Sequence, residues 1–139
     1  AAAKDELNAR VKKREAFRPF APAILREAAA DWFDLACGND DSPFMMRVSS
    51  FKAARRAAVP AVVHVDGSGR LQTVSKRDNA LFYDLIAECG RRSGVPMLLN
   101  TSFNGKDEPI VETPQHALRT MLATGLDACV FSDFVAVPQ

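Results

Sequence analysis

Three polar segments of this 139-residue chain hold residue types that could bind a small anion. The first runs from Arg10 to Arg26 and carries six Lys or Arg side chains against a single acid, Glu15. Within it, Arg18 is flanked by Phe17 and Phe20 in a stretch that prolines stiffen, and a planar guanidinium held there suits a phosphate or a carboxylate. The alternative is a solvated helix face, because cations also favour the negative end of a helix.

The second polar segment, residues 100–105, follows the short apolar run Val95–Leu99. We expect that run to be a buried central strand, and ligands gather beyond the carboxyl ends of strands in open α/β sheets. Short amide and hydroxyl side chains on such a loop, with exposed backbone N–H groups, favour an anion site. An ordinary turn stays the alternative, because Asn, Ser and Gly are also the preferred turn residues. The candidate side chains are Asn100, Thr101, Ser102 and Asn104.

The third segment is a predicted hairpin in which Asp66-Gly67-Ser68-Gly69 joins two short strands, Val62–Val65 and Leu71–Val74. Strand alternation places His64 with Asp66 on one face, and Arg70 with Gln72 on one face of the returning strand. A surface hairpin with polar cross-strand pairs is the alternative. The three cysteines form no C-x-x-C motif and only two histidines occur, so the sequence predicts no metal site.

The elements that position these segments alternate irregularly between helix and strand. The helices are expected at residues 1–14, 26–33, 79–93 and 114–123, with Gly94 and Gly125 ending the last two and Thr113 capping the fourth. Residues 17–25 are expected to be extended, at a sheet edge or crossing a site, because of Pro19 and Pro22. Further strands are expected at residues 44–51, 127–132 and 134–137. The sequence therefore predicts an α/β fold, a mixed sheet with flanking helices, in one domain spanning residues 1–139.

Composition narrows the class of protein. The chain is 47% hydrophobic and 25% charged, which is typical of a globular domain, and its net charge of +1 argues against nucleic-acid binding by bulk electrostatics. The sequence shows no signal peptide and no apolar run approaching the ~18 residues that a membrane span requires. We therefore expect a cytoplasmic protein with no membrane partner. His116, in the last predicted helix, is expected to face solvent.

Together the three segments resemble the NodU/CmcH family of O-carbamoyltransferases. The resemblance covers almost the whole chain in ordered blocks: residues 10–22, Ser42-Pro43-Phe44-Met45, Val59-Pro60-Ala61, residues 64–74, Gly94-Val95-Pro96, residues 98–104, Glu108-Pro109-Ile110-Val111 and Thr113-Pro114. Long ordered blocks of this kind are specific.

The resemblance implies a function for these blocks. In that family the carboxy-terminal half is a YrdC-like domain, with a mixed twisted sheet, that makes carbamoyl-adenylate from carbamoyl phosphate and ATP, with Mg²⁺ expected beside ATP. YrdC-like proteins share K-x-R and S-x-N signatures, which Lys12-Lys13-Arg14 and Ser102-Phe103-Asn104 match. The resemblance therefore implies Lys12, Arg14 and Arg18 as catalytic phosphate and carbamoyl ligands, although it leaves open whether Lys12 or Lys13 faces the site. It implies that Ser102 and Asn104 bind the adenylate, that Arg70 and Gln72 orient the carbamoyl group, and that His64, Asn100 and Thr101 contribute to binding.

The chain also departs from the family pattern. The Gly-Pro-Arg-Ala-Leu-Gly-type segment expected upstream is absent, as is the metal-binding amino-terminal half that transfers the carbamoyl group to a hydroxyl acceptor. We therefore expect a domain truncated at its amino-terminal side, which needs that transferase domain as a partner and is inactive alone in complete transfer. A non-catalytic or RNA-associated YrdC-like binding module is the alternative function.

Overall fold

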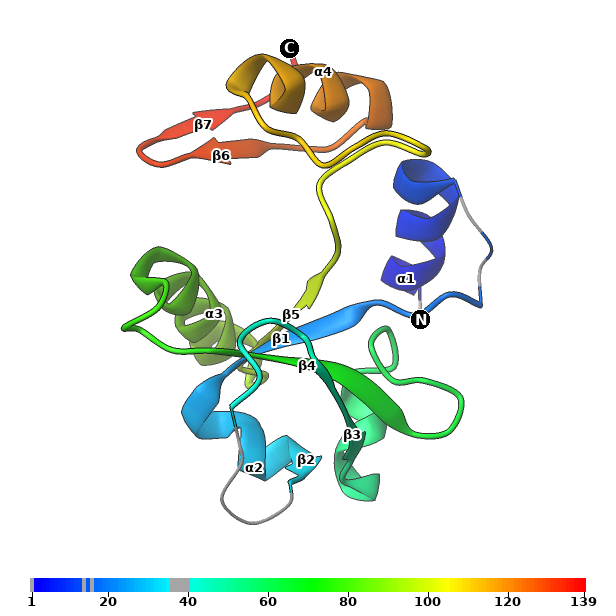
Figure 1. Ribbon diagram of the computed structural model, residues 1–139, viewed down its shortest axis with the longest axis vertical. Helices are drawn as coiled ribbons and strands as arrows, with labels where there is room; N and C mark the ends of the chain where they lie inside the picture. The colour runs from blue at the N-terminus through cyan, green and yellow to red at the C-terminus, as the bar shows by residue number, and fades with distance from the viewer. Residues whose placement is uncertain (1, 14, 16, 36–40) are drawn as a thin grey trace. The chain divides into compact units, whose positions relative to one another are not determined.

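The computed structural model describes residues 2–13, 15, 17–35 and 41–139. These residues divide into two compact units (Figure 1). The sheet unit is Pro19–Thr101, and the terminal unit combines the two ends of the chain, Ala1–Arg18 and Ser102–Gln139. Each unit has a hydrophobic core of its own.

A five-stranded mixed sheet forms the centre of the sheet unit. Its strand order is β2-β3-β4-β1-β5. Strand β1 runs parallel to β4, whereas the other neighbouring pairs are antiparallel. The strands are β1 (Ala21–Leu25), β2 (Phe33–Asp34), β3 (Arg47–Phe51), β4 (Ser68–Val74) and β5 (Met97–Asn100). The predicted mixed α/β fold with flanking helices is confirmed.

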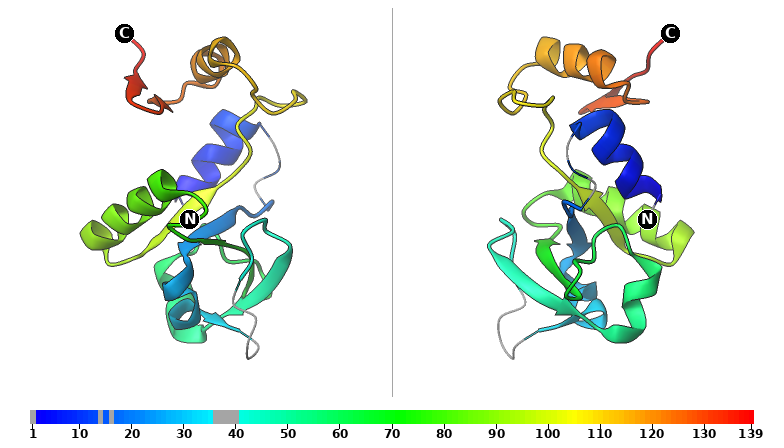
Figure 2. Two further views of the ribbon diagram at one scale, coloured as in Figure 1. Left: turned by 60° about the vertical axis from the view of Figure 1, so that its left-hand side comes forward. Right: turned by 90° about the vertical axis from the view of Figure 1, so that its right-hand side faces the viewer.

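Helix α3 (Ala80–Ser93) packs on one face of this sheet (Figure 2). It begins at Asn79, whose side chain accepts a hydrogen bond from Phe82 N at 3.0 Å, and it ends at Gly94, where φ is 76°. The end at Gly94 was expected from the sequence, whereas Asn79 was expected to be the first helical residue and instead caps the helix with its side chain. Ile86 is fully buried against Ala23, Leu25 and Val74. Burying a side chain of this size stabilises the unit by roughly 1.5–3 kcal/mol.

Aromatic side chains cover the opposite face. Phe33 and Phe51 are fully buried, with ring centroids 4.1 Å apart, and Leu71 of β4 is buried with them. Gly69 lies so close to this layer that an added Cβ would stand 2.5 Å from Phe51 Cε2. Three short helices flank these residues: η2 (Arg26–Ala28), α2 (Ala29–Trp32) and η3 (Ala53–Ala58). The first two confirm the helix expected at residues 26–33.

Strand β1 lies in the interior of the sheet, so the prediction that it lies at a sheet edge is wrong. It pairs with β4 on one side and β5 on the other, and all five of its residues are buried. Proline is tolerated because the parallel ladder to β4 begins only at Ala23, one residue after Pro22. Pro22 therefore sits at the start of the strand, where its missing N–H interrupts no pairing with β4.

The predicted hairpin around Asp66-Gly67 is wrong in one respect: its first strand does not form. The turn itself forms, with Gly67 at φ 82° and His64 N donating to Ser68 O at 2.8 Å. However, Val62–Val65 is not a strand, because both edges of β4 are already paired, with β3 and with β1. A local turn signal does not reveal that distant strands occupy these edges.

Strand β5 lies at the edge of the sheet, which overturns its expected central position. It pairs only with β1, and of its four residues only Met97 is buried. Its apolar side chains are covered partly by α3 instead of by a second strand, since Leu98 packs against the cluster around Ile86. A short apolar run is compatible with either arrangement.

The terminal unit consists of helices and a small hairpin. The helices are α1 (Ala2–Glu6), the π-helix η1 (Leu7–Lys12) and α4 (Pro114–Thr124). Strands β6 (Cys129–Phe131) and β7 (Phe134–Ala136) pair antiparallel in a separate two-stranded sheet. These elements confirm the helices expected near residues 1–14 and 114–123 and the two closing strands. Ala117, Met121 and Cys129 form the core of the unit.

Both ends of α4 carry the expected caps. Thr113 Oγ1 accepts a hydrogen bond from His116 N at 3.2 Å, and Gly125 ends the helix at φ 65°. Arg10 of η1 hydrogen-bonds the backbone oxygen of Gly125 and lies 3.5 Å from Asp127 Oδ1. A cation at the carboxyl end of a helix complements its negative pole, so Arg10 ties η1 to α4. Among the described helices, none is both long and apolar enough to cross a membrane.

Candidate functional site

Lys12, at the end of η1, places its ammonium group in the loop that follows β5. Its side chain is buried, with the residue only 7% exposed. The three protons of Lys12 Nζ face four acceptor oxygens: Ser102 O at 2.5 Å, Asn104 Oδ1 at 2.7 Å, Ser102 Oγ at 3.1 Å and Asn104 O at 3.3 Å. The structure therefore brings the Lys of the K-x-R segment onto both polar residues of the S-x-N segment. It also separates the two lysines, because Lys13 is exposed.

The hydrogen bonds of this cluster fix the orientation of each polar group. Ser102 Oγ donates to Asn104 Oδ1 at 2.7 Å, and Asn104 Nδ2 donates to Glu108 O at 2.8 Å. Since Asn104 Oδ1 receives two donors, the amide cannot be turned without losing both. Glu108 closes the loop, because its carboxylate accepts from Gly105 N at 3.2 Å. The loop is thus a preformed set of oxygens around one cation.

The remaining cations of the first segment are arranged differently. Arg18 is about half exposed, with its Nη1 3.8 Å from Glu15 Oε2. Its backbone oxygen accepts from Asn8 Nδ2 at 3.1 Å, and Asn8 is only 1% exposed. Asn8 is a buried positioning residue that sequence analysis missed, because an isolated Asn in a helical pattern carries no signal of its own. Arg14 lies outside the described residues.

A row of polar side chains lies on one face of the sheet unit. Ser68, Arg70 and Gln72 alternate with the buried Gly69, Leu71 and Thr73 along β4, so they share a face. Asn100 Nδ2 donates to Gln72 Oε1 at 2.5 Å, although β1 runs between their strands. In the sheet, Ala21 of β1 pairs with Asn100, and Ala23 of β1 pairs with Gln72. Each alanine side chain is a single methyl group, which leaves room for the two amides to meet across β1.

Gln72 is held further by Pro43 O, which its Nε2 reaches at 3.1 Å. Arg70 is exposed, and Thr101 is half-buried. The predicted sharing of a face by Arg70 and Gln72 is confirmed.

The Asp66-Gly67 turn joins three polar side chains. Ser68 Oγ donates to Asp66 Oδ1 at 2.6 Å, Ser68 N donates to the same oxygen at 2.9 Å, and Ser68 Oγ lies 3.1 Å from His64 Nδ1. The hydrogen bond from the Ser68 hydroxyl, followed by that from its backbone N–H, lowers the pKa of Asp66 from its usual value. Ser68 is buried, whereas Asp66 is exposed. Sequence analysis named His64 but missed Ser68, which links it to Asp66.

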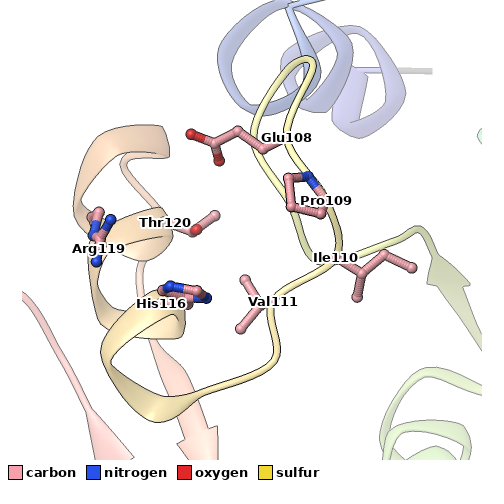
Figure 3. A pocket seen from close by; sticks show the side chains of 7 residues that line it. All are labelled: Glu108, Pro109, Ile110, Val111, His116, Arg119 and Thr120. Carbon is pink, nitrogen blue, oxygen red and sulfur yellow. The ribbon is translucent and has the colours of Figure 1, made fainter.

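Two hollows lie near these residues, one in each unit. In the terminal unit, a hollow of about 210 Å³ lies between α4 and the segment after the Asn104 loop, where Glu108 and Val111 face Thr120 and His116 (Figure 3). His116 is exposed, as expected. In the sheet unit, a hollow of about 710 Å³ is lined by Gln72, Phe44 and Phe82 together with residues of the turn before α3. Within the described ranges, no group of three or more His, Cys, Asp or Glu is placed to hold a metal ion.

Comparison with known proteins decides the family. The model of the family described as Carbamoyltransferase C-terminus matches residues 1–137. The chain belongs to this carbamoyltransferase family. The match includes both segments of the Lys12 cluster and the polar row of the sheet unit, and it confirms the resemblance inferred from the sequence.

Individual relatives agree with this membership of the carbamoyltransferase family. Nodulation protein NolO of Bradyrhizobium diazoefficiens is 46% identical over 132 residues, covering 95% of this chain and 24% of NolO. Nodulation protein U of Sinorhizobium fredii is 43% identical over 101 residues, covering 73% of this chain and 17% of that protein. An uncharacterized protein of Methanocaldococcus jannaschii is 34% identical over 132 residues, covering 95% of this chain and 25% of its own length. The carbamoyltransferase C-terminus described here thus spans about a quarter or less of the length of these relatives.

Proposed function

We propose that this chain is the carbamoyl-activating part of an O-carbamoyltransferase, which binds carbamoyl phosphate and ATP and forms carbamoyl-adenylate. The observation that supports it is the placement of Lys12 Nζ on Ser102 and Asn104. In the proposed reaction, water first converts carbamoyl phosphate to carbamate and phosphate. A carbamate oxygen then attacks the α-phosphorus of ATP, and pyrophosphate leaves.

The chemistry of the Lys12 cluster fits a phosphate oxygen. Four oxygens that Lys12 Nζ contacts belong to two backbone carbonyls, a hydroxyl and an amide, and these four are uncharged. A phosphate oxygen carries negative charge, so beside the ammonium it adds a Coulomb attraction that an uncharged oxygen does not supply. A phosphate oxygen would therefore displace the weakest contact, to Asn104 O at 3.3 Å, while the other contacts keep Lys12 in place.

The remaining roles follow from the same proposal. Fixed cations and amides aligned on the reacting groups stabilise the charge that develops in phosphoryl chemistry. We assign Lys12, Arg14 and Arg18 to the phosphates, and Ser102 and Asn104 to the adenylate. Arg70 and Gln72 would orient the carbamoyl group, with His64, Asn100 and Thr101 contributing to binding. Mg²⁺ would arrive with the ATP phosphates, since it is commonly held by phosphate oxygens and water with few protein ligands.

Transfer of the carbamoyl group to a hydroxyl acceptor belongs, in this proposal, to a part of the relatives that this chain does not span. The chain covers only 24% of NolO, which leaves ample length for an acceptor-binding domain. That transferase domain is the proposed protein partner. Use of ATP would place the reaction in the cytoplasm.

The test is calorimetric titration of the chain with carbamoyl phosphate and with ATP. Lys12→Met should weaken carbamoyl phosphate binding roughly 10- to 150-fold, because hydrogen bonds to charged groups contribute about 1.5–3 kcal/mol. The matched control is Lys13→Asn, which removes the neighbouring charge at a position where φ is 45° and Asn is tolerated. Wild-type affinity in a folded Lys12→Met variant would refute the proposed role of the cluster. Release of pyrophosphate on mixing ATP with carbamoyl phosphate tests adenylate formation separately.

A further inference from the structure

The hollow between α4 and the segment after the Asn104 loop contains a buried hydroxyl group. Thr120 is only 8% exposed, and its side chain points from α4 into this hollow of about 210 Å³ (Figure 3). Its backbone oxygen accepts from Thr124 Oγ1 at 2.6 Å, but its own hydroxyl group makes no hydrogen bond to the described residues. Buried hydroxyl groups are normally hydrogen-bonded, so one that opens into a hollow marks a place where a ligand can bind.

Two further polar side chains border the same hollow. Glu108 extends its carboxylate toward α4, and the ring of His116 lies one turn before Thr120 on the helix (Figure 3). Residues four apart share a helix face, so the imidazole and the hydroxyl group lie on the same side of α4. Glu108 Oε2 accepts from Gly105 N at 3.2 Å, and its other carboxylate oxygen has no hydrogen bond or ion pair within the described ranges. The hollow is therefore bordered by three groups that can each accept a hydrogen bond.

The wall of the hollow that faces α4 is apolar. Pro109 and Val111 stand across the hollow from the helix, and Val111 also packs against the core of the terminal unit (Figure 3). The backbone N–H of Val111 donates to Phe103 O at 2.9 Å, which holds this wall in place. Such a wall suits a short aliphatic chain. The volume of about 210 Å³ equals that of roughly seven water molecules at ~30 Å³ each, which is too small for a nucleotide.

We propose that this hollow binds a small aliphatic primary amine in its ammonium form. An ammonium group carries three donors and no acceptor, which matches Glu108, Thr120 and the neutral imidazole of His116. The charge-assisted hydrogen bond to the Glu108 carboxylate supplies most of the attraction. Arg119 also lines the hollow and opposes a cation there, but it is exposed, so solvent and salt screen its charge. The site is independent of the proposed function, because it involves no carbamoyl ligand.

Binding in the hollow is reported by the loop that holds Lys12. Glu108 closes this loop in two ways: its carboxylate accepts from Gly105 N, and its backbone oxygen accepts from Asn104 Nδ2 at 2.8 Å. An ammonium group beside the carboxylate competes with Gly105 N for the same negative charge. The amide proton of Gly105 therefore senses whether the hollow is occupied.

The first measurement follows the backbone amides of the whole chain by ¹⁵N–¹H correlation spectroscopy during a titration with butylamine. At mildly alkaline pH imidazole is neutral, whereas an alkyl amine is still protonated. We expect saturable shifts of the Gly105, Val111 and Thr120 amides. Butyrate, which attaches a carboxylate to an aliphatic chain of similar length, should cause no such shifts. Either the absence of saturable shifts with butylamine or equal shifts with butyrate would overturn the proposal.

The second measurement compares the dissociation constants of variants for butylamine, obtained from the same titration. Glu108→Gln should weaken binding roughly 10- to 150-fold, because it removes the charged acceptor but keeps an oxygen for Gly105 N. Thr120→Val should weaken binding about fivefold, and Thr120→Ser, which keeps the hydroxyl group, should bind like the wild type.

The matched control is Asp107→Asn. It removes the same charge one residue away, at a position outside the hollow where φ is 61° and Asn is tolerated. We expect this variant to keep the wild-type affinity for butylamine. Equal losses in Asp107→Asn and Glu108→Gln would reduce the effect to the net charge of the loop and refute a site in the hollow. A folded Thr120→Ser variant as weak as Thr120→Val would contradict the role of the hydroxyl group.

Discussion

Gly69 offers the sharpest test of how the sheet unit is packed. In Gly69→Ala, the new Cβ would stand 2.5 Å from Phe51 Cε2 and 3.3 Å from Val62 O. Ordinary contacts between carbon atoms begin near ~3.5 Å, so the ring would have to move by about 1 Å. Phe51 is fully buried, and its ring centroid lies 4.1 Å from that of Phe33, so a shift of the ring would disturb this packing.

The expected cost combines two opposing terms. Overpacking a core costs about 1–3 kcal/mol, whereas replacing glycine within a strand recovers roughly 0.5–1 kcal/mol. We expect Gly69→Ala to lower the free energy of unfolding by about 1–2 kcal/mol. Phe51→Leu alone should also lower the free energy of unfolding. The loss in the double variant should be smaller than the sum of the two single losses, by roughly 1 kcal/mol.

Urea unfolding followed by the fluorescence of Trp32 measures these quantities. Trp32 is the only tryptophan of the chain, and it is buried in the sheet unit, so the signal reports on that unit. Each of the four proteins of the cycle must show a single transition for its free energy to be compared. Strict additivity of the two substitutions, or a Gly69→Ala variant as stable as the wild type, would refute the proposed clash.

Two further predictions concern charges and caps. Hydrogen bonds from Arg91, and secondly from Arg92, lower the pKa of Glu88 from its usual value of 4.5. Arg91→Ala should therefore raise the pKa of Glu88, which an NMR titration of the carboxyl group measures. An unchanged titration curve would contradict the role of Arg91. Because the folded pKa is depressed, the stabilisation by Glu88 is present above its unfolded pKa and is lost as the pH falls through its folded pKa. Thr113→Ala should cost about 1 kcal/mol of unfolding free energy and Thr113→Ser should restore it, since the hydroxyl caps α4. Equal stability of the two variants would argue against the cap.

The sequence predicts most of the elements of this fold because their signals are local. Asn79 and Gly94 mark the ends of α3, and Thr113 and Gly125 mark those of α4, through hydrogen bonds that close within a few residues. The order of the strands is not local. The central position of β1 and the edge position of β5 depend on which distant strands pair with them, and a five-residue apolar pattern does not encode its partners.

The candidate site shows the same division. The meeting of Lys12 with Ser102 and Asn104 was expected from the two signatures, although nothing in the pattern separated Lys12 from Lys13. The left-handed conformation of Lys13 at the end of η1 makes that choice, because it ends the helix after Lys12 and leaves Lys13 exposed. The link between His64 and Asp66 through Ser68 could not be predicted, since Ser68 was expected in the turn but begins β4, and His64 was expected in a strand but lies outside any strand.

The wide turns of η1 have a consequence for how this chain tolerates changes in length. A π-helix places one more residue in each turn than an α-helix does, and such segments behave as single-residue insertions. If one exposed residue such as Ala9 were lost, Leu7–Lys12 could relax to the tighter spacing of α1. Because the lost residue and the tighter turn offset each other, the side chains after the deletion would keep roughly their present direction about the axis. The Lys12 ammonium would stay among its oxygens, so this segment should tolerate a one-residue deletion that in an α-helix would rotate every later side chain by roughly 100°.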